Sequence, residues 1–179
     1  MNTSFVTNKY TQGFTLLEML FAVLIFSFAL VSLMTIASKG VIATTTAKQQ
    51  MAAQFLAEEA LEVGRNVRDG NYLNSSDWLT VLGQCSETTI PCDVDYTTNP
   101  LTPVLTTCSG GCQNRQLYDN KGTFRPEPNG GNLTTFWRTL VIKPSSTENE
   151  KIMEATVHWK QKTVDRALTL TTHIANWQP

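Results

Sequence analysis

A run of uncharged, mainly apolar residues near the amino terminus constrains the fold of this chain more than any other feature. From Met19 to Ala37 the sequence contains no Asp, Glu, Lys, Arg, Gly or Pro. At the helical rise of about 1.5 Å per residue, this run is roughly as long as the hydrocarbon core of a bilayer is thick. The run therefore predicts one membrane-spanning helix, which we place at residues 14–38.

One carboxylate, Glu18, lies at the outer edge of this predicted span, just after Gly13 and Phe14. An ionised carboxylate in hydrocarbon costs a few kcal/mol unless a cation neutralises it, so an ionisable residue at this position indicates a functional site. Residues 1–13 are polar and contain Lys9 as their one charged side chain. They lack the length and the apolar core of a secretory signal peptide.

The run Gly-Phe-Thr-Leu-Leu-Glu-Met-Leu at residues 13–20 resembles the class III signal of type IV pilins and of the pseudopilins of type II secretion systems. The resemblance implies that a prepilin peptidase cuts after Gly13, which makes residues 1–13 a leader, and that it methylates the new amino terminus at Phe14. It further implies that Glu18 acts in subunit assembly, neutralised by the amino group of Phe14 on a neighbouring subunit.

The hydrophobic segment differs from many major type IV pilins in one respect. Those proteins have a proline partway along it, whereas this chain has none between Phe14 and Ala37. A minor pilin or a pseudopilin is therefore favoured over the major subunit of a flexible pilus. Two other interpretations stay open: a signal peptide cut around residues 37–40, and an uncleaved single-span anchor with Glu18 at the headgroup level.

The helical pattern continues beyond the membrane segment, over residues 39–70. Apolar side chains recur there at steps of three and four, while the charged side chains fall on another face. The apolar positions are Met51, Phe55, Leu56, Ala60, Val63 and Val67. Low helix propensity at residues 39–46 predicts a loosened turn or bend, and Gly70 is expected to cap the helix.

Residues 71–179 are expected to form a single globular head. Frequent Gly and Pro make residues 71–132 loop-rich, with a short helix or turn at 78–82 and a short strand pair within 116–124. Residues 133–177 show the period of two expected of antiparallel strands. We expect Trp159 to pair with Leu168, and Met153 with Ile174, in a sheet that packs on the helix at Phe55, Leu56 and Val63. The fold class is thus α+β, with a long amino-terminal helix packed on a carboxyl-terminal antiparallel sheet, as in pilins.

Four cysteines lie in the middle of this head, at positions 85, 92, 108 and 112. An even number in a loop-rich exported domain favours disulfides, for which three connectivities are possible. Short closures favour Cys85 with Cys92 and Cys108 with Cys112. The alternative is a four-cysteine zinc site, although neither spacing matches the two-residue pairs of common zinc modules.

Composition argues against several other classes of function. With 14 Lys+Arg against 15 Asp+Glu, the chain has no excess of positive charge, so we expect no nucleic-acid partner. His158 and His173 fall at outward strand positions without a triad-like arrangement. We therefore expect no enzyme, no cofactor and no metal. For residues 93–95 we expect a solvated loop, and calcium binding is the alternative. For Trp137, Trp159 and Trp177 we expect packing in the core or on the sheet, and an aromatic binding surface is the alternative.

These patterns together predict a pilin-like structural subunit that assembles through its amino-terminal helix. The resemblance implies a single-pass protein of the inner membrane with an extracytoplasmic head, and a periplasmic or extracellular filament after assembly. Its partners would be the membrane, prepilin peptidase, the inner-membrane assembly platform, and other pilin or pseudopilin subunits. The alternative function is a membrane-anchored binding module, for adhesion or for DNA or ligand capture, that does not polymerise.

Overall fold

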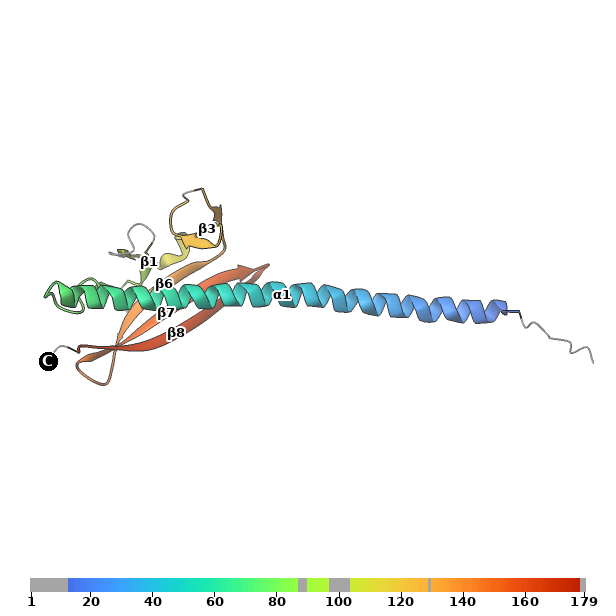
Figure 1. Ribbon diagram of the computed structural model, residues 1–179, viewed down its shortest axis with the longest axis horizontal. Coiled ribbons are helices and arrows are strands. Elements are labelled where there is room, and N and C mark those ends of the chain that lie inside the picture. Colours follow the sequence, from blue (N-terminus) through green and yellow to red (C-terminus); the bar gives the residue numbers. More distant parts are fainter. Residues whose placement is uncertain (1–12, 87–89, 97–103, 129, 178–179) are drawn as a thin grey trace, which may run out of the picture. The chain divides into compact units, whose positions relative to one another are not determined.

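A computed structural model describes residues 13–86, 90–96, 104–128 and 130–177 of the chain. One long helix precedes a head made of short 3-10 helices and antiparallel strands (Figure 1). The elements are α1 (Leu16–Leu73), η1 (Leu82–Gln84), β1 (Cys92–Asp95), β2 (Val104–Thr107), η2 (Cys112–Asn114), β3 (Tyr118–Asn120), β4 (Thr123–Arg125), β5 (Asn132–Leu133), β6 (Trp137–Pro144), β7 (Glu150–Gln161) and β8 (Val164–Ala175). This arrangement confirms the predicted α+β class.

The chain divides into two units, residues 1–45 and residues 46–179. The second unit contains the head together with the carboxyl-terminal part of α1. Its main sheet has five strands in the order β2-β1-β6-β7-β8, and a smaller sheet has the order β4-β3-β5, with antiparallel neighbours throughout. Residues 71–132, expected to be dominated by loops, therefore also contain strands β1 to β4.

Helix α1 continues through residues 39–46 as regular α-helix, so the loosened turn predicted there does not interrupt it. The hydroxyl groups of Thr44 and Thr45 donate to the carbonyl oxygens of Gly40 and Val41, at 2.9 Å each. These bonds run back along the helix, so the threonines add to its hydrogen bonding and do not draw the backbone into another conformation.

The expectation that Gly70 caps α1 is wrong, because the helix continues to Leu73. The main-chain N–H and the side-chain amide of Asn74 both donate to the carbonyl oxygen of Gly70, at 3.1 and 2.9 Å. Ser75 then takes the left-handed conformation, with φ of 54°. Asn74 thus satisfies the carbonyl of Gly70 twice, and a non-glycine residue makes the turn after the helix.

The helix buries part of the apolar stripe that the sequence predicted, since Leu56, Ala60 and Val63 lie in the core. Met51 and Phe55 are 54% and 68% exposed, so their assignment to the contact face is wrong. The buried positions include Ala53, Leu56, Ala57, Ala60, Leu61, Val63 and Gly64. Small side chains let the helix backbone approach the sheet closely, and a Cβ atom at Gly64 would overlap the thioether of Met153.

The β7–β8 pair forms with a register two residues from the predicted one. Met153 pairs with Thr172 and Val157 with Leu168, because Gln161 pairs with Val164 and leaves only two residues in the turn. A shift of two keeps every side chain on its predicted face. The four inward positions of β7, Met153, Ala155, Val157 and Trp159, are accordingly at most 6% exposed.

Within the second unit, helix α1 and strand β8 run in the same direction (Figure 1). Three long-range hydrogen bonds join the helix to the end of β7, to β8 and to the residue after β8. The side chain of Gln161 donates to Thr46, Arg65 donates to Thr172 at 3.3 Å, and the hydroxyl of Tyr72 donates to Asn176 at 2.6 Å. The predicted strand pair within 116–124 is also present as the β3–β4 hairpin. Near 78–82, a turn followed by η1 buries Trp78 and Leu82.

Candidate functional site

The start of helix α1 places Glu18 in the first helical turn. Thr15 precedes the helix, and its hydroxyl oxygen accepts a hydrogen bond from the main-chain N–H of Glu18 at 3.3 Å. The Thr-x-x-Glu spacing is that of a capping box, and a carboxylate near a helix amino terminus also interacts favourably with the helix dipole. The sequence analysis did not assign this role to Thr15, although the spacing alone could have indicated it.

Gly13 and Phe14 lie before the helix and are exposed. Phe14 is 79% exposed, and a Cβ atom added at Gly13 would meet no atom within 4 Å. The fold of the chain itself therefore places no steric demand for glycine at position 13. Any such demand would come from a molecule that acts on this segment.

The helix that follows exposes its apolar side chains along the first unit. Large apolar residues from Leu16 to Ile42 are 47% to 81% exposed. The hydroxyls of Ser27, Ser32 and Thr35 each donate to the carbonyl four residues earlier, at 2.7 to 2.9 Å. In the part of the chain that the structure describes, α1 is the one helix long and apolar enough to cross a membrane. Apart from Glu18 and Lys39, this segment thus needs an apolar environment but no external polar partner.

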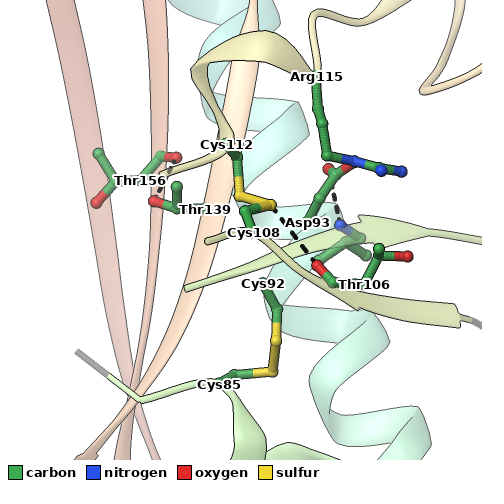
Figure 2. The surroundings of a disulfide bond; sticks show 10 residues. Cys85, Cys92, Asp93, Thr106, Cys108, Cys112, Arg115, Thr139 and Thr156 are labelled. Carbon is green, nitrogen blue, oxygen red and sulfur yellow. Dashed lines mark hydrogen bonds and ion pairs between the residues drawn. A yellow bond between two sulfur atoms is a disulfide. The ribbon is translucent and has the colours of Figure 1, made fainter. Parts of the chain in front are cut away.

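Two disulfides brace the head. Cys85 is joined to Cys92, and Cys108 to Cys112, the pairing that the sequence favours (Figure 2). The Cα atoms of the two pairs are 5.2 and 5.1 Å apart. Because these bonds use all four sulfur atoms, no thiolate is left for the zinc site considered as the alternative.

Replacing both Cys85 and Cys92 by alanine is expected to lower the free energy of unfolding by about 2–4 kcal/mol, because the bond closes a chain loop and its sulfurs lie in the core. Denaturant titration of the full chain in detergent measures this loss. The matched Cys108 and Cys112 double variant should lose less, since its loop is shorter. Equal stability of wild type and the Cys85 and Cys92 variant would contradict a structural role for that bond.

Asp93 lies in strand β1 and is buried, which corrects the expectation of a solvated loop at residues 93–95. One carboxylate oxygen accepts from Nε of Arg115 at 2.7 Å, and the other from the main-chain N–H of Val94 at 2.8 Å (Figure 2). Within the described residues, no group of three or more His, Cys, Asp or Glu could hold a metal ion. The calcium hypothesis therefore has no support in this part of the head.

A buried arginine joins α1 to the sheet. Its role was not predicted from the sequence. The side chain of Arg138 in β6 is fully buried and forms an ion pair with Glu59 of α1. Its other terminal nitrogen donates to the carbonyl of Val94 at 2.6 Å. Burial, followed by the negative charge of Glu59, raises the pKa of the neighbouring Tyr96 hydroxyl. The sequence feature that could have indicated this ion pair is a single arginine at an inward position of an apolar strand.

The remaining aromatic and histidine residues divide between the core and the surface. Trp159 is buried in the core, whereas Trp177 is 61% exposed beside Tyr72. Trp137 stacks on His158, with ring centroids 5.0 Å apart. Nδ1 of His173 lies 2.9 Å from a carboxylate oxygen of Glu150. The three tryptophans therefore do not form one aromatic surface.

The stability of the head should depend on the protonation of His158. Burial lowers the pKa of His158 below its ordinary 6.5, so the unfolded chain binds more protons just below that pH. The free energy of unfolding is therefore expected to fall as the pH drops from about 6.5 towards the folded-state pKa. Denaturant titrations at several pH values measure this slope, and His158→Phe, which retains an aromatic ring for stacking, should flatten it. An unchanged slope in that variant would contradict the assignment.

A second acidic transition has a separate origin. A hydrogen bond from Ser145, and then one from His173, lower the pKa of Glu150 from its ordinary 4.5. The stability that these contacts contribute is present above that pH and is lost as the pH falls through the lowered pKa. The contributions of His158 and Glu150 to the free energy of unfolding therefore change in different pH ranges.

The fold and the exposed amino-terminal segment together define a pilin-like layout, with one long apolar helix packed on an antiparallel sheet. The family model described as the prokaryotic N-terminal methylation motif matches residues 8–34. This motif is the class III prepilin signal of type IV pilins and pseudopilins, and it supports a type IV pilin-like or pseudopilin protein. Comparisons with curated proteins and with solved structures find no match.

Proposed function

We propose that this chain is a structural subunit, a minor pilin or a pseudopilin, of a type IV pilus or a type II secretion-like filament. It is made as a membrane-anchored precursor with an extracytoplasmic head, cut after Gly13 by prepilin peptidase, and methylated at Phe14. The assembly platform of the inner membrane then inserts it into a filament of similar subunits. The subunit catalyses no reaction.

The observation that carries this proposal is the methylation motif on a helix whose apolar side chains are exposed in the described part of the first unit. Such a surface is stable in a lipid bilayer before assembly. It is equally stable in a bundle of like helices, where each helix shields its neighbours from water. The same segment can therefore serve as an anchor and as the core of a filament.

Glu18 gives this packing a defined register. A carboxylate within an apolar bundle is costly unless a cation meets it, and opposite charges attract far more strongly there than in water. Cleavage after Gly13 would create such a cation, the amino group of Phe14. A neighbouring subunit satisfies Glu18 only where that amino group comes close to it.

The charge of Glu18 is tested by replacing it with alanine. Loss of one partner of a buried charge pair costs about 3–5 kcal/mol, so Glu18→Ala should stay in the membrane but enter filaments at least tenfold less than wild type. Quantitative blotting of sheared filaments against membranes measures this ratio. Thr15→Val removes the capping hydroxyl and keeps the carboxylate, so it separates the effect of helix capping from the effect of the charge of Glu18. Normal incorporation of Glu18→Ala would remove the register role.

A further inference from the structure

The head contains an apolar groove beside helix α1 that the proposed function leaves unused. Helix residues Lys48, Met51 and Phe55 line one side, and Tyr96 and Phe124 line the other. The groove encloses about 400 Å³. All of these residues belong to the second unit, so the groove is a feature of the head alone.

The helical side of the groove is unusual because it leaves large apolar side chains in water. Met51 is 54% exposed and Phe55 is 68% exposed, although both lie on a helix that buries alanines on its other side. Exposed apolar groups gathered along a hollow mark a surface that binds another apolar surface. A groove along a helix is a shape that accepts a second helix.

The charges at the groove restrict what can bind there. The carboxylate of Glu59 also lines it, but Glu59 is already paired with Arg138. The other charged side chain of the lining is Lys48, which is exposed and for which the described residues supply no carboxylate. The groove thus combines apolar walls with one available cation, so its complement is an apolar helix with one carboxylate.

The amino-terminal part of α1 has this composition. Glu18 is its one carboxylate before residue 58, and Phe21 and Ile25 follow at 57% and 66% exposure. The spacing of Glu18, Phe21 and Ile25 is three and then four residues. Lys48, Met51 and Phe55 have the same spacing. Residues at these steps share one face of a helix, so two parallel helices can match charge to charge and apolar residue to apolar residue.

We propose that the groove receives the amino-terminal helix of a second copy of this chain, with Glu18 of that copy beside Lys48. This inference rests on the proposed filament function and names the surface that one neighbour uses. A carboxylate has two oxygens and about four acceptor positions. Lys48 of one neighbour and the amino group of Phe14 of another can therefore both bind Glu18.

A charge exchange tests this contact in filaments. Lys48→Glu should lower incorporation about tenfold, the effect expected of a lost charge pair of about 1.4 kcal/mol, and Glu18→Lys should lower it at least as much as Glu18→Ala. The double variant should be incorporated better than Glu18→Lys alone, because the charge pairing with position 48 is restored while the repulsion from the Phe14 amino group remains. Lys39→Glu, on the same helix but outside the groove, should incorporate normally and should fail to rescue Glu18→Lys. Normal incorporation of Lys48→Glu would overturn the groove contact.

A crosslink provides a second readout that does not depend on the Glu18 variants. Cysteines placed at Phe21 and Met51 of the same chain should form covalent oligomers when intact filaments are oxidised. Cysteines at Phe21 and Thr169 should not, since Thr169 lies on the outward face of β8. Filaments that contain the Phe21 and Met51 variant but give no crosslinks would overturn the proposal, and so would a crosslink from Met51 to a different protein alone. Absence of the wild-type chain from filaments would instead contradict the proposed function.

Discussion

Replacing Glu59 by alanine is expected to lower the free energy of unfolding of the head by about 3–5 kcal/mol, because a buried cation then loses its counter-charge. The guanidinium of Arg138 has no exposed surface, and its Nε atom has no hydrogen-bond partner in the described structure. Its remaining bonds go to the carbonyl oxygens of Leu56 and Val94, which carry no formal charge. Denaturant titration of the full chain in detergent measures the loss.

The neighbouring residue provides a matched control. Glu58 is exposed and accepts a surface hydrogen bond from the side-chain amide of Gln54 at 3.0 Å. Glu58→Ala should therefore change stability by no more than about 0.5 kcal/mol. The double variant Glu59→Leu with Arg138→Met should recover much of the loss, since it removes both charges together. If Glu59→Ala and Glu58→Ala were equally stable, the buried pair would not hold α1 to the sheet.

Replacing Gly13 by valine is expected to abolish leader cleavage almost completely. Gly13 is exposed, and a Cβ atom added there meets no described atom within 4 Å, so the substitution should not disturb the fold. A peptidase that binds this segment in an extended form has to accommodate the added side chain beside the scissile bond. Coexpression with prepilin peptidase, followed by gel electrophoresis, measures the fraction that shifts to the mature size.

Gly40→Val serves as the control for this experiment. A Cβ atom at Gly40 also meets nothing within 4 Å, and Gly40 lies within α1, far from the cut. This variant should be processed like the wild type. A Gly13→Val precursor that shifts as completely as Gly40→Val would show that cleavage does not occur at this glycine.

The sequence predicted the elements of the fold better than their contacts. The uncharged run at residues 19–37 and the alternation of apolar and polar residues in β7 are both local patterns. The helix and the strand faces could therefore be assigned from the residues alone. The register of β7 against β8 depends on the length of the turn, which no period encodes. An error of two residues in the predicted register was possible because such a shift keeps the same side chains on the inward face.

The buried face of α1 was harder to predict for a different reason. Hydrophobicity favours Met51 and Phe55, whereas close packing on the sheet favours Ala57 and Gly64. A sequence pattern weighs apolar size, and the structure selects side chains that fit the available space. The pair of Glu59 and Arg138 was missed likewise, because nothing local indicates that residues 79 positions apart will meet.

The candidate site at the amino terminus was predicted almost entirely from its motif. Gly13, Phe14 and Glu18 follow from a short run of residues, and the methylation-motif match covers that run. The head offers no comparable motif. Its groove depends on Phe124, which reaches α1 only through the folding of the β3–β4 hairpin, so it could not be read from the sequence.

Mass spectrometry of the amino-terminal peptide, isolated from cells that have an active prepilin peptidase, tests the central claim most directly. A chain that begins with methylated Phe14 is the predicted result, because the amine created there is the cation proposed for Glu18. A chain that still begins with Met1, or that begins near Ala37, would contradict the account and would favour a membrane-anchored binding module that does not polymerise.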